Sequence, residues 1–583
     1  MSVYFNGETL IIPGAYSAID VSQMATKSDG DGAKIIAIIG ECTGGVPGDI
    51  NFISNPVSAK KILKSGELLT ACNKAWNPVS RSKEGVALGG ANIIACIRTN
   101  KGTRATATVN SDQLVFSSKD WNTEANQIQV KIQDGTLSNT KKIIINNQAT
   151  EVYETFDNVG GAFTISYTGN KAYATLSITK NESNQITLVT KVGDSSETAT
   201  EDIKILLDPN VIKSIRGLVA RLQAYENYKV AISPYYNARL SVDSLDLVEN
   251  SNIKHSDGQV DYRVTNVYAD LSHKLKNGSE LISLESYNQE KGKINNFEYI
   301  NLTGGTDGTS PASWIPFFDA LTNYDITYIV PLTDDPVVHA ELLAHVDAMS
   351  GSKGRERRMI VGGGIGESLN DTIERAKAFV NARAQVVHGG FYDVDGANLV
   401  LYPPYILAAQ HAGRCAFLED GETATHDVYR MASPEYKLET DEIEELLKAG
   451  CLAFEFVLGD NSLSSSFVRL VQDITTDTVS EDVIHTERAM GALADSLNKE
   501  IRKSLDSMFT GKRTGLGVLT SIKNRVISIL FKRKLAEQIV EYKDVVVTKS
   551  GVVTYIDYSV APAEPNNFIL ITAHYYSKEL TVE

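Results

Sequence analysis

The sequence predicts a multidomain protein that combines α/β domains with a separate β domain, and three observations lead to this fold class. Apolar runs of strand length alternate with helix patterns in residues 34–98 and again in residues 301–450. A long region of short alternating strands lies between these two stretches. A long helix, a basic helix and strand-like segments follow residue 480, and they predict an α+β domain at the C-terminal end.

The composition is that of a folded protein without membrane spans. Hydrophobic residues make up 42% and charged residues 22% of the 583 residues, which is enough for roughly three or four domains with cores of their own. No apolar run approaches the ~18 residues of a membrane helix. The N-terminal segment MSVYFNGETL lacks the basic and apolar regions of a secretory signal. We therefore expect no membrane partner.

The cysteines and the net charge argue against a disulfide-bonded protein, a metal-cluster protein and a nucleic-acid-binding protein. The five cysteines are widely scattered and lie mostly in apolar runs, so we expect buried, reduced thiols in a cytoplasmic product and no disulfide framework or metal cluster. The net charge of -16 argues against nucleic acid as a partner, because binding to phosphates needs a basic surface. The same charge keeps an abundant subunit in solution through self-repulsion.

The first α/β stretch begins after an N-terminal segment, residues 1–20, that has apolar positions but no helical period. Lys34–Cys42 is an apolar run of strand length, and Asn55 followed by proline predicts the start of a helix. Glu67–Trp76 reads as a second helix and Ile93–Arg98 as a buried strand. Residues 21–104 are therefore predicted to form the first part of an α/β core.

The composition and the hydrophobic pattern of the sequence change near residue 105. Residues 105–207 are rich in Thr, Ser, Asn and Val with strong alternation, which predicts a β-sandwich or barrel inserted into the α/β unit. We expect this β domain at about 105–208 within an inserted outer region that extends to residue 300. Asn210–Tyr228 shows helical spacing of its apolar residues.

A second α/β domain is predicted for residues 301–450, with a parallel, doubly wound or closely related sheet. A C-terminal domain, residues 451–567, follows and contains a long helix at about Glu481–Phe509. The expected strands of the α/β domain are Ile326–Leu332, Arg358–Val361 and Gln385–His388. The expected helices are one that starts near Pro311, one that opens at Asp335–Pro336, and Ser368–Ala382, Tyr405–Phe417 and Thr440–Lys448.

The glycine turn Gly362–Gly366 lies where a phosphate-binding loop would lie between a strand and a helix. The turn lacks the Lys-Ser/Thr pair of a nucleotide-binding loop, and the acidic Glu367 directly after it would repel a phosphate. We therefore interpret it as a tight packing turn and expect no cofactor.

Ser310, in the segment GTSPA, resembles the nucleophile segment of subtilisins, but neither preceding histidine has the context of a catalytic base. We expect Ser310 to cap a helix that begins at Pro311. His339 and His345 are six residues apart and do not share a helix face as zinc ligands at i, i+4 would. The acidic run 439–445 reads as the solvated face of a helix. No catalytic residues and no metal ligands are predicted, so the protein is not expected to be an enzyme.

The basic stretch Gly511–Lys534 carries seven basic residues and no acidic residue. Three interpretations are open: a solvated helix face, a nucleic-acid or membrane patch, or a contact with an acidic protein. Leu516, Leu519, Ile522, Val526, Ile527, Ile529 and Leu530 are apolar enough to hold this helix on its own domain. In the third interpretation Lys523, Arg525, Lys532 and Arg533 project towards the partner.

Eight segments, in order along the chain, resemble the tail sheath proteins of contractile bacteriophages and related contractile injection machines. They cover nearly the whole chain outside residues 105–300. The segments are PGAYSAID (Pro13–Asp20), IIGECTGGVPGD (Ile38–Asp49), SGELLTACNKAWNP (Ser65–Pro78), LTGGTDGTSPASW (Leu302–Trp314), YIVPLTDDPVVHAEL (Tyr328–Leu342), RMIVGGGIGES (Arg358–Ser368), VRLVQDITT (Val468–Thr476) and FTGKRT (Phe509–Thr514).

The resemblance implies a structural subunit of the virion's contractile tail. It implies an α/β domain of subtilisin-like topology without catalytic residues, an inserted β domain, and a C-terminal domain that lies against an inner tail tube. Subunits of such sheaths form stacked hexameric rings, assemble in the bacterial host cytoplasm, and contract to drive the tube through the host envelope for genome ejection. The implied partners are further copies of the chain, the tube protein, the baseplate and the tail terminator.

Two alternatives stay open: the sheath of a non-phage contractile injection system and, more remotely, a β-rich surface-layer protein.

The resemblance also implies extended arms at both ends of the chain, which link neighbouring subunits by adding strands to their sheets. We expect these arms in residues 1–20 and 568–583, where strand-like termini would otherwise expose unpaired edges. The arm residues expected to contact a neighbour are Val3, Phe5, Leu10, Ile12, Ile569, Ile571, Tyr575 and Leu580. The basic residues Lys523, Arg525, Lys532 and Arg533 are expected to face an acidic tube.

Overall fold

The computed structural model describes residues 3–5, 8–10, 34–351, 353–459 and 466–575. The chain divides into two compact units. We call Lys101–Gly308, together with Met1–Ala18, the inserted unit, and Ile19–Asn100 with Thr309–Glu583 the main unit. Both units mix helices with several sheets, which confirms the α/β plus β class in general terms. Across the described residues, none of the helices combines the length and apolar character that a membrane-spanning segment requires.

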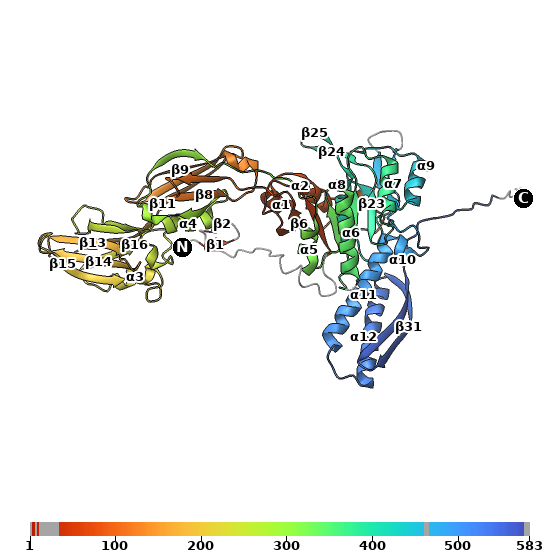
Figure 1. Ribbon diagram of the computed structural model, residues 1–583. Coiled ribbons are helices and arrows are strands. Elements are labelled where there is room, and N and C mark those ends of the chain that lie inside the picture. The colour runs from red at the N-terminus through yellow and green to blue at the C-terminus, as the bar shows by residue number, and fades with distance from the viewer. Residues whose placement is uncertain (1–2, 6–7, 11–33, 352, 460–465, 576–583) are drawn as a thin grey trace, which may run out of the picture. The chain divides into compact units, whose positions relative to one another are not determined.

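A seven-stranded sheet forms the centre of the main unit (Figure 1). Its strands, in spatial order, are β28 (Cys451–Leu452), β23 (Ala384–Val387), β22 (Arg358–Gly362), β21 (Tyr328–Pro331), β3 (Ile35–Gly40), β6 (Ile93–Arg98) and β4 (Ile50–Ile53). All neighbouring pairs are parallel except β4 with β6. Because β3 pairs with β21, strands from before and after the inserted unit join one sheet.

Helices cover both faces of this sheet, so its strands are buried on two sides. In β3, Ile36 and Ile38 pack into one core while Ile35, Ala37 and Ile39 pack into the other, which explains the continuous apolar run. The first core contains α1 (Pro56–Leu63), α2 (Glu67–Trp76) and α8 (Pro404–Phe417). The second contains α5 (Ile315–Ala320), α6 (Pro336–Ser350), α7 (Leu369–Lys377) and α9 (Thr440–Lys448).

Two small sheets complete this part of the main unit. The four-stranded sheet consists of β29 (Phe454–Val457), β30 (Phe467–Leu470), β26 (Val428–Tyr429) and β5 (Val79–Arg81). The three-stranded sheet consists of β25 (Asn398–Tyr402), β24 (Phe391–Asp395) and β27 (Ser433–Pro434).

The inserted unit contains two hydrophobic cores, one nested inside the other along the chain. The outer part of the sequence builds the first core with β7 (Thr106–Val109), β8 (Leu114–Ser118), β9 (Ile128–Asp134), β10 (Lys141–Asn147), β11 (Val152–Val159), α4 (Val267–Gly278), β19 (Ile282–Tyr287) and β20 (Phe297–Asn301). The second core uses β12 (Gly161–Tyr167), β13 (Tyr173–Lys180), β14 (Ile186–Gly193), β15 (Thr200–Leu206), α3 (Ile215–Leu222), β16 (Tyr228–Ile232), β17 (Val248–Asn252) and β18 (Tyr262–Thr265).

The β structure therefore continues beyond residue 208, where the β domain was expected to end. The reason is long-range pairing: β16 and β18 both flank β12 as antiparallel neighbours, and such pairing leaves no local signal. The predicted helix Asn210–Tyr228 is also shorter in the structure. It starts at Ile215, where the side chain of Ser214 caps it, and Tyr228 already belongs to β16.

The C-terminal body, residues 483–562, consists of α10 (Val483–Thr486), α11 (Arg488–Phe509), α12 (Leu516–Leu535) and the hairpin β31 (Ile539–Ser550)–β32 (Val553–Pro562). These elements confirm the predicted long helix, basic helix and two strands. Leu493, Leu497, Val526, Ile529 and Val545 form part of its separate small core. The last strand was predicted at Phe568–Tyr576, and its described residues, Phe568–Tyr575, have no regular secondary structure.

Candidate functional site

The basic helix α12 is held on the C-terminal body by an apolar stripe. Ile522, Val526, Ile529 and Leu530 recur at helical spacing, and all four are buried. Leucines and an isoleucine of α11, together with residues of β31, complete the core around them. This packing confirms that α12 is fixed to its own domain by its apolar side, except at Leu516, which was predicted to take part and is 85% exposed.

Lys523, Arg525 and Lys532 lie on the exposed part of α12. The guanidinium of Arg525 donates from Nε to Oγ of Ser504, 2.6 Å away on α11. These three predicted site residues are therefore at the surface, where a partner can reach them.

The prediction that Arg533 projects outwards is wrong. Arg533 follows Val526, Ile529 and Leu530 at spacings of seven, four and three, so it belongs to the buried stripe, and its residue is only 7% exposed. It donates 2.7 and 2.8 Å hydrogen bonds to carboxylates of Glu500 and Asp420. Burial alone would lower its pKa, but these carboxylates raise it. Arg533 therefore fastens α12 to α11 and to the core.

A buried carboxylate, Asp473, fixes the start of α11 to the part of the main unit that is built around the seven-stranded sheet, which we call the sheet domain. Its Oδ2 accepts from Arg488 Nε at 2.8 Å and from the Ala424 amide at 3.0 Å, and its Oδ1 accepts from Gln385 at 3.0 Å. Arg488, the first residue of α11, also donates to the hydroxyl of Tyr328 on β21. Burial acts to raise the pKa of Asp473, but Arg488 and the hydrogen bonds hold it well below its ordinary value.

Sequence reasoning missed this joint. The available signal is an aspartate among the apolar residues Val468, Leu470, Val471 and Ile474, because a buried carboxylate requires partners. The partners come from distant parts of the sequence and cannot be read from spacing.

The hairpin β31–β32 is a sheet of only two strands within the described residues, so each strand has one edge without a β partner there. Tyr542, Ile556, Tyr558 and Val560 pack against the helices. On the hairpin's solvent side, Val540 and Tyr555 are 62% and 52% exposed. Exposed apolar side chains beside open strand edges are features of a sheet that can accept further strands.

The C-terminal segment is anchored after the hairpin at Ala563, whose amide donates to the Gln538 carbonyl, and again at Asn567. Asn567 donates a 2.8 Å hydrogen bond to Oε1 of Glu487, next to the start of α11. Beyond it the predicted arm residues Ile569, Ile571 and Tyr575 are 74%, 86% and 96% exposed. Leu580 lies outside the described residues.

At the N-terminal end, β1 (Val3–Phe5) and β2 (Glu8–Leu10) pair with each other as an antiparallel ribbon. Val3 lies opposite Leu10 and Phe5 opposite Glu8. These predicted arm residues thus pair within the chain here, which departs from the expected arm ordered only by a neighbour. Ile12 lies outside the described residues.

The glycine turn at 362–366 is a packing turn. The backbone amide of Gly366 donates to Glu435 Oε1 at 2.9 Å, and that of Gly390 donates to Glu435 Oε2 at 2.7 Å. Glu367 accepts a 3.0 Å hydrogen bond from Arg375. A carboxylate of the chain itself therefore takes the place that a bound anion would need.

Ser310 does not cap a helix, because α5 begins only at Ile315 and follows Trp314. Its hydroxyl lies 2.6 Å from that of Thr99, and it donates to Oε1 of Glu41 at 2.7 Å. The serine thus fastens the segment before α5 to the first α/β stretch through partners that do not include a histidine base.

The remaining candidates are packing residues. His339 donates to the carbonyl of Thr333, and His345 accepts from Arg357. Burial first, and then the neighbouring arginines Arg375 and Arg357, lower the pKa of each histidine to about 4, so both are neutral near pH 7. All five cysteines are buried and free, as predicted. The acidic run forms a capping box at the start of α9, from Glu439 to Glu442.

Comparisons with known proteins agree along nearly the whole chain. The profile of the phage tail sheath protein central domain matches residues 294–476. The tail sheath protein of Bacillus phage SP01 is 30% identical over 98% of this chain and 97% of its own length. The putative tail sheath protein of Enterococcus phage phiEF24C is 31% identical over 94% of each chain.

The fold has a solved counterpart. The crystal structure of the sheath tail protein from Desulfitobacterium hafniense superposes with a TM-score of 0.54 at 15% identity, over 94% of this chain and 97% of the other. At that identity the similarity concerns the fold alone.

Proposed function

Because the chain belongs to the family of phage tail sheath proteins, we propose that it is the structural subunit that polymerises into a contractile tail sheath. In this proposal the subunits form stacked hexameric rings around an inner tail tube. Contraction of the rings drives the tube through the host envelope for genome ejection. The subunits assemble in the bacterial host cytoplasm and meet the tube protein, the baseplate and the tail terminator.

The observation that carries the proposal is the contrast within the C-terminal body between a firmly fixed base and an open hairpin. Arg488 and Arg533 tie α11 and α12 to the sheet domain, while β31 and β32 offer free edges within the described part of the chain. Phe568–Ile571 exposes four consecutive large apolar side chains, each at least 74% exposed. The exposed apolar segment of one copy can therefore pair with the open hairpin edge of another copy, because each chain carries both features.

We propose that residues 568–583 add a strand to the hairpin of a neighbouring subunit, and that residues 1–20 form a second link. Main-chain hydrogen bonds between strands depend little on the side chains, so such links can persist while whole domains rotate during contraction. The ribbon formed by β1 and β2 would have to open for its residues to pair with a neighbour.

We propose that the exposed residues Lys523, Arg525 and Lys532 of α12 face the inner tube. Seven basic residues in this stretch contrast with the net charge of -16 for the whole chain, which favours an acidic partner at this surface. Arg533 is not part of this contact.

The domain roles follow the same proposal. The α/β core, residues 21–104 and 301–450, would be the subtilisin-like domain without catalysis. Residues 451–567 would form the inner assembly domain, and residues 105–300 would be the outer decoration.

Electron microscopy of the purified, overexpressed chain tests the proposed function. We expect long, hollow helical tubes to form without any other phage protein. Dispersed globular particles at every concentration and salt condition that keeps the chain folded would contradict the proposal.

A further inference from the structure

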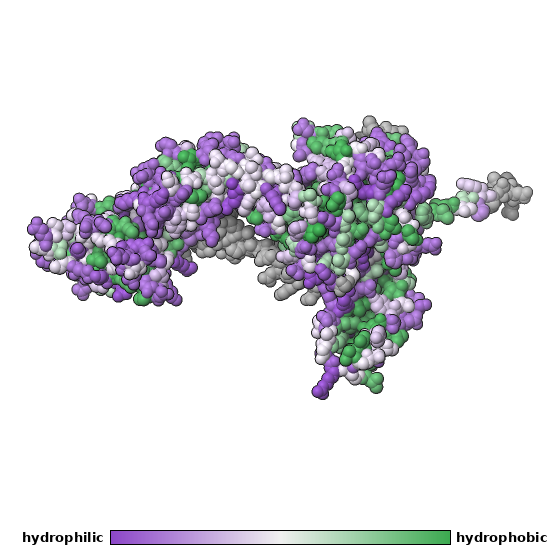
Figure 2. Space-filling view, in the orientation of Figure 1, coloured by the Kyte–Doolittle hydropathy of each residue, from purple (hydrophilic) through white to green (hydrophobic). Residues whose placement is uncertain are grey.

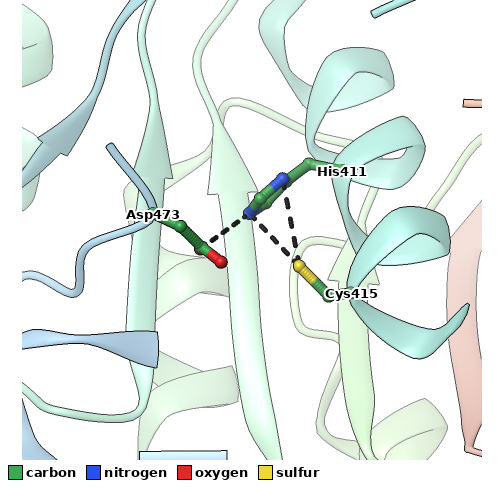
Figure 3. A group of neighbouring side chains, drawn as sticks. All are labelled: His411, Cys415 and Asp473. Carbon is green, nitrogen blue, oxygen red and sulfur yellow. Dashed lines mark hydrogen bonds and ion pairs between the residues drawn. The ribbon is translucent and has the colours of Figure 1, made fainter. Parts of the chain in front are cut away.

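Three side chains with metal-binding atoms meet in the interior of the main unit. His411 and Cys415 lie one turn apart on the same face of α8, and Asp473 follows β30 (Figure 3). All three residues are completely buried. The three potential ligand atoms lie within 4.8 Å of one another.

The arrangement is not that of a catalytic Cys–His–Asp relay. In such a relay the nucleophile and the carboxylate contact opposite nitrogens of the imidazole. Here Cys415 Sγ lies 3.3 Å and Asp473 Oδ1 3.4 Å from the same atom, His411 Nε2. Burial also keeps substrates away. Two ligand-type atoms beside one imidazole nitrogen are what a bound cation needs.

The surroundings hold two of these groups in place. His411 Nδ1 lies 2.6 Å from the hydroxyl of Tyr429, so donation from Nδ1 to this hydroxyl leaves the lone pair of Nε2 directed at the cluster. Arg488 and the Ala424 amide donate to Oδ2 of Asp473, and Gln385 donates to Oδ1 at 3.0 Å, which leaves a second lone pair of Oδ1 for the cluster. Metal-binding histidines and carboxylates usually have such outer hydrogen bonds, which orient them.

We propose that His411 Nε2, Cys415 Sγ and Asp473 Oδ1 bind one Zn²⁺ ion that ties α8 to the segment leading into α11. Nitrogen, thiolate sulfur and carboxylate oxygen form a ligand set suited to zinc. Binding releases the proton of the Cys415 thiol, and the thiolate then offsets one of the two positive charges of the ion, while Asp473 is shared between the ion and Arg488. A non-protein ligand such as water completes a tetrahedral ion.

One adjustment is required for binding. Sγ lies beside the imidazole ring, 3.9 Å from Nδ1, so rotation about the Cα–Cβ bond of Cys415 must bring it towards the side of Nε2 (Figure 3). Binding requires a neutral imidazole and a thiolate, so zinc binding weakens as the pH falls.

The full-length chain, purified from zinc-supplemented cells, tests the proposal by its metal content and by Co²⁺ titration after chelation. We expect about one zinc per chain and a thiolate-to-cobalt charge-transfer band. Cys415→Ser should abolish the band and lower zinc affinity at least ~10-fold. The matched control is Cys451→Ser, which removes a buried thiol on β28 outside the cluster. This variant should leave the charge-transfer band and the zinc affinity unchanged.

A second variant separates ligand loss from misfolding. Tyr429→Phe keeps all three ligands and removes the partner of Nδ1, so the band should remain while zinc affinity falls about 10- to 100-fold. The proposal is overturned if the folded wild-type chain binds no stoichiometric zinc and gives no thiolate band with Co²⁺. A band that survives Cys415→Ser overturns it as well.

Discussion

The inserted unit and the C-terminal body use their apolar residues in opposite ways. The inserted unit closes two cores of its own, and its exposed large apolar residues, such as Tyr235 and Val260, are scattered along the chain with no run longer than the pair Val152–Tyr153 among the described residues. The C-terminal body has a single small core and is followed by the exposed run Phe568–Ile571 (Figure 2). Scattered exposure is ordinary for a surface, whereas a continuous apolar run indicates a surface that a partner covers. The inserted unit is therefore complete in itself, and the C-terminal body is completed by assembly.

Removing residues 568–583 should have the largest effect on polymerisation of all the changes considered. We expect a folded subunit that no longer polymerises, because the strand proposed to fill the neighbour's hairpin is gone. Sedimentation and electron microscopy measure the loss of tubes, and circular dichroism measures the fold. Tubes that form at the wild-type concentration would show that the segment does not link subunits.

Arg488→Met should strongly destabilise the joint between the C-terminal body and the sheet domain. It leaves Asp473 buried without its main cation, which costs about 3–5 kcal/mol of unfolding free energy. Lys448→Met is the control, because Lys448 and its partner Glu444 are both exposed on α9, where a pair contributes less than ~1 kcal/mol. Denaturant unfolding compares the two variants. Equal losses of unfolding free energy in the two variants would show that the pair of Arg488 and Asp473 does not hold the C-terminal body on the sheet domain.

Acid should weaken the same joint at Asp420. Burial raises the pKa of Asp420, but Lys34, Ser496 and Arg533 outweigh it and lower the pKa to about 2. Because the folded-state pKa is depressed, its stabilisation of about 2 kcal/mol is present above pH ~4 and is lost as the pH falls towards 2. The stability difference between wild type and Asp420→Asn should shrink over this range. A difference independent of pH would exclude this role.

Reversing charge on the exposed side of α12 should affect attachment and leave the fold intact. With Lys523→Glu and Arg525→Glu combined, binding to purified tail tubes should fall several-fold at low salt, and the deficit should shrink as salt screens the charges. Lys448→Glu, at an exposed position of α9, is the control. Unchanged tube binding at low salt would refute the tube contact.

Deleting Lys101–Gly308, the inserted unit without its N-terminal segment, should have the smallest effect on polymerisation. Lys101 and Gly308 approach so closely that a side chain added at Gly308 would collide with the Lys101 carbonyl, so a short linker can join Asn100 to Thr309. We expect the shortened chain to fold and to form tubes of smaller outer diameter in electron micrographs. A folded variant unable to polymerise would give the inserted unit a part in assembly.

Local signals were sufficient for much of the fold. Helices α2 and α9 and strand β6 have the predicted bounds, because their periodicity and flanking residues agree. The outward orientation of Arg533 was mispredicted because its charge was given more weight than its position on the apolar stripe. Asp473 was missed because its partners, Gln385 and Arg488, meet it only in the folded chain.

The most direct measurement is a cryo-electron microscopy reconstruction of tubes formed by the full-length chain, examined at the hairpin β31–β32. The account predicts additional strands from neighbouring subunits, hydrogen-bonded along the open edges of the hairpin, with residues 568–583 forming one of them. A reconstruction in which both edges face solvent and subunits meet through other surfaces would contradict it.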